Sequence, residues 1–216
     1  MNEESYTKYK DIRNMAWEML IRFQTNCLPI DIKQIAEECR VTVQTYAESG
    51  ELVAACGLEA VRDENRAFSV FTDRWYILYD DADEAPLFAI AHELAHILLK
   101  HPFARQKVGF FTASYSNFNR DELSLLVDEQ DANTLATRLL APACVLRRLK
   151  VCDAETMMWL CGLPLSVAEA RAERMGQLID RDKFFLRKDE ERVFELFKDF
   201  IAQAPELFLQ EGQEGQ

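Results

Sequence analysis

The sequence predicts an α+β fold that is mostly helical and contains a small antiparallel sheet. Two observations favour this class: long segments repeat apolar residues at helical spacing, and three short segments are rich in β-branched or aromatic residues. The 216 residues are 49% hydrophobic with only 7 Gly and 6 Pro, which indicates a packed core. We expect one domain over residues 1–150, a helical region packed on it over 151–210, and a flexible tail over 211–216.

The first third of the chain is predicted to form two helices and then three strands. Apolar residues recur every three or four positions over residues 5–27, and a second helix follows Asp31, which can cap it together with Gln34. The segments VTVQTY, AFSVFT and WYILYD are typical of strands, and a turn near Asp73 joins the last two. We therefore expect the small antiparallel sheet in this part of the chain.

The middle of the chain is predicted to contain two helices and a long loop between them. A helix is expected over residues 83–101, with Pro86 in its first turn and Pro102 after its end. The segment that follows is rich in aromatic, Ser and Asn residues, and ordered loops of such length are often functional. A second helix is expected over residues 122–140, because Pro142 stops it.

The last third is predicted to be a set of short helices. The segments AETMMWLCG and SVAEARAERM are separated by a turn that contains glycine, and this pair resembles a helix-turn-helix. A final helix carries an apolar stripe composed of Val193, Phe194, Phe197, Phe200 and Ile201.

Charge and cysteine content limit the function classes. The chain has 25 Lys and Arg against 37 Asp and Glu, a net charge of −12, which disfavours direct binding of nucleic acid or of a membrane surface. No apolar run is long enough to span a bilayer, and the N-terminus lacks the apolar segment of a signal peptide. The six cysteines form no CxxC pair, so we expect free, mostly buried thiols in a cytoplasmic protein.

The segment FAIAHELAHILLKH carries the main chemical signal, the pattern HExxH. Residues four apart lie on one side of a helix, so the imidazoles of His92 and His96 can bind one metal ion, while Glu93 can contact a water molecule on that ion. HExxH also occurs by chance on solvated helices, but here apolar residues surround the motif and predict a buried helix. Buried His and Glu side chains need partners, and a metal supplies them.

A zinc site needs a third protein ligand, and three residues are candidates. His101 follows His96 by five positions and, if the helix continues, projects about 180° from His92, so we interpret it as a histidine that interacts with the helix dipole. Asp128 and Glu129 flank the extrapolated apolar stripe of the helix LSLLVDEQDANTLATRLLAP. Spacing alone does not separate these two carboxylates, and both could instead be solvated residues of a first helical turn.

Together, FAIAHELAHILLKH and EQDANTLATRLLAP resemble the two motifs of the ImmA/IrrE family of metallo-endopeptidases. The second family motif is E-x-x-A-N-x-x-A-x-x-L-L-x-P, although this chain has Leu135 and Ala141 where the family often has Phe and Met. Weaker similarity extends over residues 28–175. The resemblance implies a zincin-like, gluzincin-type core with His92, His96 and Glu129 as zinc ligands and Glu93 as catalytic base. It also implies a protein substrate, typically a transcriptional repressor of a mobile element or stress response.

The predicted function is therefore a zinc-dependent metallo-endopeptidase, with manganese as the other possible metal. Tyr115 and Asn117 of the long loop are candidates for stabilising the oxyanion, and the segment AFSVFT could pair with an extended substrate. One alternative is a metal-stabilised module that binds a helix-turn-helix repressor without cleaving it. The other is a DNA-binding regulator, which the charge and the absence of basic residues in MMWLCGLPLSV disfavour.

Overall fold

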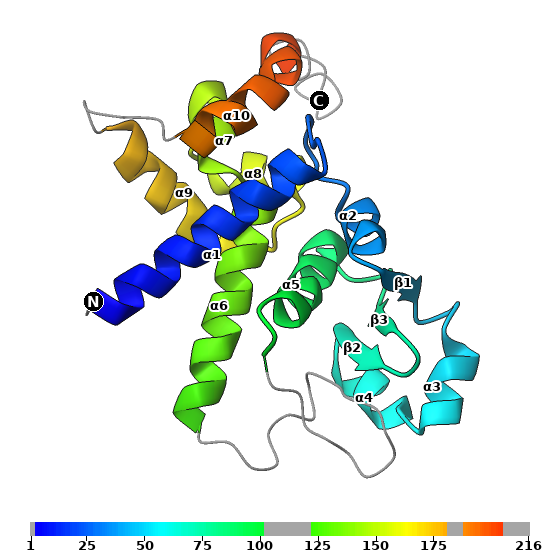
Figure 1. Cartoon of the computed structure of the whole chain (residues 1–216). Helices are drawn as coiled ribbons and strands as arrows, with labels where there is room; N and C mark the ends of the chain where they lie inside the picture. The colour runs from blue at the N-terminus through cyan, green and yellow to red at the C-terminus, as the bar shows by residue number, and fades with distance from the viewer. Residues whose placement is uncertain (1–2, 102–121, 181–187, 205–216) are drawn as a thin grey trace. The chain divides into compact units, whose positions relative to one another are not determined.

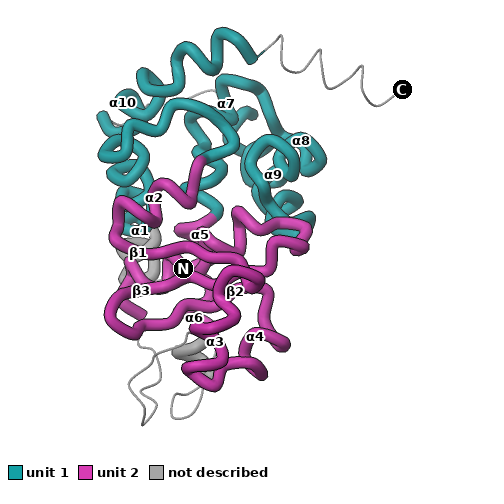
Figure 2. The backbone as a smooth tube through the Cα atoms, turned by 90° about the vertical axis from the view of Figure 1, so that its right-hand side faces the viewer, with its two compact units in different colours: residues 1–30, 137–216 teal, residues 31–136 magenta. Residues whose placement is uncertain are grey.

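The structure, a computed structural model, describes residues 3–101, 122–180 and 188–204 (Figure 1). These residues form a mostly helical α+β structure with one small sheet, which confirms the fold class at this level. The chain divides into two compact units, one composed of residues 31–136 and the other of residues 1–30 and 137–216 (Figure 2). Residues 1–30 group with residues 137–216 because the first helix packs against the helix over residues 188–196. The expected tail over 211–216 lies outside the described residues.

The unit composed of residues 31–136 begins with helix α2 and contains the sheet. Helix α2 (Ile32–Glu38) starts at Asp31, whose carboxylate accepts a hydrogen bond from the backbone N–H of Gln34 as a helix cap. The strands are β1 (Val41–Thr45), β2 (Ala67–Phe71) and β3 (Trp75–Tyr79). Their order is β1-β3-β2, so β3 lies in the centre and β2 forms one edge of the described sheet.

The sheet is mixed, so the prediction of an antiparallel sheet is wrong for one of its two strand pairs. Strands β2 and β3 form an antiparallel hairpin in which Phe71 pairs with Trp75. Strand β1 instead runs parallel to β3, with Val41 opposite Trp75. Parallel neighbours need a long crossover connection. Here the chain between β1 and β2 forms α3 (Gly50–Cys56) and α4 (Glu59–Glu64), two helices that the sequence analysis did not predict.

Different elements cover the two faces of the sheet. Side chains alternate between faces along a strand. Phe68 and Val70 of β2 pack with Leu78 of β3 and with Val53 and Val61 of α3 and α4. The opposite face, which includes Ser69 and Ile77, packs against α5 (Pro86–Leu98). Figure 1 shows the strands lying between α5 and the α3–α4 pair.

The regular elements described in the second unit are all helices. It contains α1 (Glu3–Arg22), the end of α6 (Glu122–Leu140) and four later helices. Helix α1 packs on α10 (Lys188–Leu196), α7 (Ala143–Leu149) packs on α9 (Leu165–Ile179) and on α10, and α8 (Ala154–Cys161) packs on α9. The turn between α8 and α9 contains Gly162 in a left-handed conformation. The pair is therefore two packed helices joined by a tight turn, and its resemblance to a helix-turn-helix stays a prediction.

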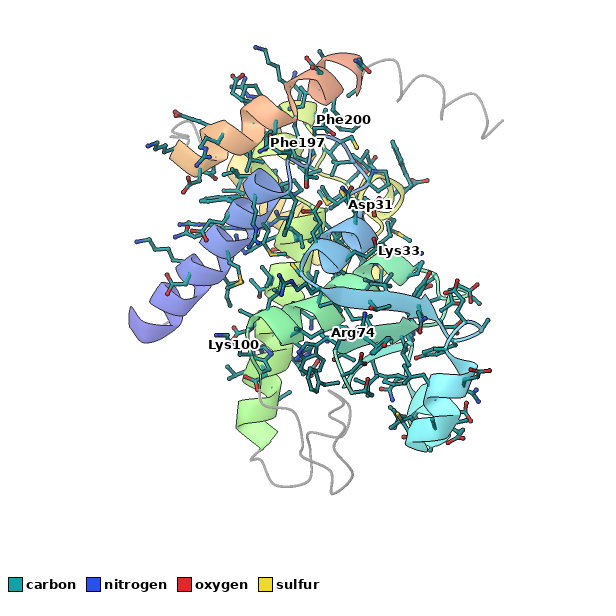
Figure 3. The ribbon with its side chains drawn as sticks, turned by 45° about the vertical axis from the view of Figure 1, so that its right-hand side comes forward. Asp31, Lys33, Arg74, Lys100, Phe197 and Phe200 are labelled. Atoms are coloured by element: carbon teal, nitrogen blue, oxygen red, sulfur yellow. The ribbon has the colours of Figure 1, made fainter. Side chains whose placement is uncertain are left out.

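Two further expectations concern the predicted apolar stripe at the chain end and the cysteines. Val193 and Phe197 are fully buried, and the Phe197 ring packs edge-on against Phe200, which Figure 3 labels.

All six cysteines are free, but only Cys144 and Cys161 are buried, whereas Cys27 and Cys152 are exposed. Among the described helices, none combines the length and the apolar character that a bilayer crossing requires.

Candidate metal centre

The HExxH segment forms the middle of α5, as predicted, and this helix is buried on nearly all sides. It begins with Pro86 in its first turn, where the missing N–H costs nothing. Ile90, Ala91, Leu94 and Ala95 are at most 1% exposed. The two polar side chains among them, Glu93 and His96, are 6% and 4% exposed. Burial of two ionisable groups on one apolar helix costs free energy unless other groups compensate them.

The compensating groups come from helix α6, which has the limits that the sequence predicted. His92 Nε2 lies 3.0 Å from His96 Nε2. Glu129 of α6 completes a triangle with them, its two carboxylate oxygens lying 3.2 Å from His92 Nε2 and 3.4 Å from His96 Nε2. Ligand atoms of these three residues therefore meet at one place, although they come from two helices separated by residues 99–121.

These distances fit a zinc ion in the middle of the three side chains. Zinc–nitrogen bonds of about 2.0–2.1 Å and tetrahedral angles place neighbouring ligand atoms about 3.3 Å apart. The observed separations of 3.0, 3.2 and 3.4 Å bracket that value. Two Nε2 atoms that face each other at 3.0 Å also have no good direct interaction when both imidazoles carry their proton on Nδ1. The residues thus suit a divalent cation, which would satisfy all three at once.

The hydrogen bonds of His92 support the same arrangement. Its Nδ1 lies 3.0 Å from Oδ1 of Asn133, which can only accept a hydrogen bond. When Nε2 of His92 binds a metal ion, its ring proton is on Nδ1 and is donated to Asn133. Such an outer partner fixes the tautomer and the orientation of a metal-binding imidazole. The sequence contained a usable signal for this role, since Asn133 lies one helical turn after Glu129 and hence on the same side of α6.

The electrostatics of the centre favour a negative Glu129 and a positive partner. Hydrogen bonds to His92 and His96 hold the pKa of the Glu129 carboxyl well below its ordinary value. For His92, burial alone lowers the pKa, but the interactions with Glu129, Glu93 and Asn133 outweigh it and raise the pKa overall. The centre thus holds positive charge readily, whether on an imidazolium or on a metal ion.

Glu93 has the properties of a proton acceptor. Burial raises the pKa of its carboxyl above the ordinary value, and the neighbouring His92 and His96 offset this only in part. Its Oε2 is buried and has no hydrogen-bond partner among the described residues. A raised pKa brings a carboxylate closer to neutral pH, where a general base works best. The free oxygen can therefore accept a proton from a water molecule in the centre.

His101 contacts His96, one of the two histidines of the centre, and the helix whose continuation would project it about 180° from His92 ends before it. The helix does not continue to His101, because Lys100 adopts a left-handed conformation with φ 55°. The N–H of Lys100 then donates to Ile97 O and that of His101 to His96 O, the hydrogen-bond pattern of a Schellman motif. This turn brings the buried ring of His101 back to His96, with their Nδ1 atoms 2.9 Å apart. Figure 3 labels Lys100 at this end of α5.

The structure separates the two carboxylates between which spacing could not decide. Glu129 meets the two histidines of the HExxH motif, whereas Asp128 Oδ1 lies 3.7 Å from Nε2 of His101. Asp128, Asp131 and His101 form a second group whose ligand atoms approach one another. Tyr115 and Asn117, the candidates for the oxyanion, lie outside the described residues.

Comparison with models of known protein families gives no match to this chain, and no curated protein sequence matches it either. The family resemblance therefore depends on the residues of the two motifs, and the chemistry depends on the geometry described above.

Proposed function

We propose that this chain is a zinc-dependent metallo-endopeptidase of the zincin type, similar to the ImmA/IrrE family. The observation that carries the proposal is the convergence of His92, His96 and Glu129 at 3.0–3.4 Å beside a buried Glu93 that has an unpartnered oxygen. Three protein ligands and a free fourth position are typical of catalytic zinc sites, whereas structural sites use four protein ligands.

The residues divide the reaction between them. A zinc ion held by these ligands would lower the pKa of a water molecule and polarise the scissile carbonyl. Glu93 takes the proton of the attacking water and later transfers it to the leaving amine. Asn133 keeps the His92 ring in the required orientation. The half-exposed Glu129 side chain gives the centre access to solvent and hence to a substrate.

We propose that an extended protein segment reaches this centre along the sheet. Strand β2 is an edge strand of the described sheet, and the face that carries Ser69 packs against α5. An edge strand offers free N–H and C=O groups to a peptide, and this pairing gives affinity with little dependence on sequence. We infer that the substrate is a protein with an accessible extended segment, as in a repressor between its DNA-binding and oligomerisation parts.

A second candidate is a module that binds a repressor without cleaving it. The observation in its favour is a set of exposed apolar side chains on α8 and at the start of α9, namely Met158, Trp159 and Leu165. Where such side chains form one contiguous patch, they mark a protein–protein contact. A metal would then stabilise the fold, and Glu93 would have no chemical role.

One experiment separates the two candidates. The wild type, Glu93→Gln and the control Glu59→Gln, an exposed residue of α4, are each co-expressed with the repressor encoded nearest to this gene. The amide keeps the shape of Glu93 but accepts no proton, so cleavage should fall about 10²–10⁴-fold. Mass spectrometry should then find specific repressor fragments with the wild type and Glu59→Gln alone. Elemental analysis should find about one zinc ion in all three proteins.

Three other results of this experiment would contradict the proposal or favour the binding module. An intact repressor whose DNA binding is relieved equally by the wild type and Glu93→Gln would favour the binding module. Fragments produced by Glu93→Gln at the wild-type rate would contradict the role of Glu93. Wild-type protein that binds no divalent metal in titration would contradict the metal centre itself.

A further inference from the structure

The second group of possible ligands, His101, Asp128 and Asp131, shares one contact with the first. His101 Nδ1 lies 2.9 Å from His96 Nδ1, on the side of the His96 ring opposite to the metal centre. Its other ring nitrogen lies 3.7 Å from Asp128. His101 is 8% exposed, and the Asp128 side chain is 14% exposed, so both are largely removed from solvent. The two groups can therefore not be treated as independent sites.

The protons of the two rings decide how they are related. A neutral imidazole has one proton on one of its two nitrogens, and only a bare nitrogen binds a metal. If His96 binds the ion through Nε2, its proton must be on Nδ1. Two N–H groups cannot face each other at 2.9 Å, so His101 Nδ1 is bare and accepts the hydrogen bond from His96. The proton of His101 is then on Nε2, the nitrogen that faces Asp128.

We infer that His101, held against Asp128, is a positioning residue that fixes which ring nitrogen of His96 faces the metal. It follows that the group His101, Asp128 and Asp131 holds no second ion while the first is bound, because Nε2 of His101 carries a proton. This inference rests on the proposed metal centre and extends it. His92 and His96 would each have an outer partner on Nδ1, an amide oxygen of Asn133 for one and an imidazole of His101 for the other.

The backbone explains why His101 can have this role. The left-handed Lys100 reverses the chain directly after α5, and the N–H of His101 is fixed to His96 O at 3.1 Å. Backbone and side chain of His101 are therefore both attached to the same residue, His96. An imidazole held at two points loses little further freedom when it accepts a hydrogen bond, so it can orient its partner effectively.

The tautomers can be observed directly, because the chain contains only 3 histidines. Full-length protein labelled with ¹⁵N in its histidine rings and loaded with zinc is studied by long-range ¹H–¹⁵N correlation NMR. We expect protons on Nδ1 of His92 and His96 and on Nε2 of His101. A His101 ring protonated on Nδ1 would overturn the inference while leaving the metal centre intact. A chain that binds no zinc would overturn the proposed function together with the inference.

Zinc affinity in competition with a chromophoric chelator gives a second test. His101→Phe removes the acceptor and should weaken zinc binding about 10–100-fold, as loss of an outer partner does. His101→Asn can present its oxygen near the position of Nδ1 and should restore most of the affinity. Asp131→Asn should bind one zinc ion as the wild type does. Melting of the zinc-free variants checks that each is folded.

Two results would contradict the inference. One is a folded His101→Phe protein that binds zinc with the same affinity as the wild type. The other is two zinc ions per wild-type chain, the second of which is lost in Asp131→Asn, since this would make the second group an independent site.

Discussion

The α5–α6 centre and the α7–α9 region both bury ionisable side chains, but they compensate them in different ways. In the centre, Glu93 and His96 are buried among other ionisable groups that bring opposite charge or exchangeable protons. In α9, the buried Arg171 donates from Nε and from a terminal nitrogen to the backbone oxygen of Ala141, near the end of α6. Carbonyl groups at a helix end have no partner within the helix, so the arginine acts as a cap for this one.

The difference shows how buried polar residues can be assigned to chemistry or to structure. A group that faces a fixed backbone dipole has one stable protonation state and holds the fold together. When ionisable groups face one another, the protonation state of one depends on that of its neighbour. Such coupled groups are found at functional sites. We therefore expect substitutions in the centre to change metal binding, and substitutions in the α7–α9 region to change stability only.

The largest contrast is expected between the neighbouring residues Glu129 and Asp128. Glu129→Ala should weaken zinc binding more than about 100-fold, because it removes a ligand and not merely an outer partner. Asp128→Ala should weaken it about tenfold, because it acts only through His101. Competition with a chelator measures both affinities. Equal losses, or a larger loss for Asp128→Ala, would mean that the two carboxylates have been assigned to the wrong groups.

Substitutions of Asn133 test whether its hydrogen bond orients the His92 ring. Asn133→Leu removes the acceptor for the Nδ1 proton and should reduce zinc affinity about 10–100-fold. Asn133→Asp keeps an acceptor oxygen, so its zinc affinity should be close to that of the wild type. Isothermal titration with zinc gives both values. If the leucine variant is folded and binds zinc normally, the hydrogen bond at 3.0 Å does not orient the ring.

Substitution of Arg171 should lower stability and leave zinc affinity unchanged, in contrast to substitution of Asn133. Arg171→Met retains an unbranched apolar stem but leaves Ala141 O without these donors, which should lower the free energy of unfolding by about 1.5–3 kcal/mol. Urea unfolding measures this loss, and zinc affinity should not change. The matched control is Arg174→Met on the same helix, whose hydrogen bond to Gln177 is exposed and contributes little. A loss of zinc affinity in Arg171→Met would remove the distinction between the two regions.

The smallest expected effect concerns the thiols of the α7–α9 region. Burial raises the pKa of Cys144 and of Cys161 from 9.0 to about 12. Folded protein treated with iodoacetamide near pH 8 should therefore be alkylated at the exposed Cys27 and Cys152 but not at the buried pair. Peptide mass spectrometry identifies the sites, and early labelling of Cys144 would contradict the prediction.

The same thiols make stability depend on pH in the alkaline range. The raised pKa means that the folded state keeps these protons while the unfolded state releases them. Their contribution is constant below about pH 9 and decreases as the pH rises toward 12.

The sequence predicted the parts of the fold that have a clear period. Helix α6 has the predicted limits, Asp31 caps α2, and the three strands occur in the predicted segments. The apolar surroundings of HExxH also predicted the burial of α5 correctly. These features follow from local patterns of apolar residues, which a single sequence contains.

Other features depend on contacts that no local pattern contains. Helices α3 and α4 have only 7 and 6 residues, too few for a period to be visible. The direction of β1 depends on how those helices carry the chain across the sheet. The position of His101 depends on Lys100 adopting a left-handed conformation, which sequence usually signals with glycine or asparagine at that place. Spacing therefore predicted that His92 and His96 lie together, but not the contact between His96 and His101.

The mixed sheet has a consequence for the order in which the chain folds. The β2–β3 hairpin closes a short turn, and isolated hairpins form in about 1–10 μs. Strand β1 can join β3 only when the intervening residues 46–74 close a much longer loop, whose entropy cost is larger. We therefore expect the hairpin and the following helix α5 to assemble first, with β1 added later at the opposite edge. The part of the sheet nearest to the HExxH helix would then be the earliest to form and the last to open.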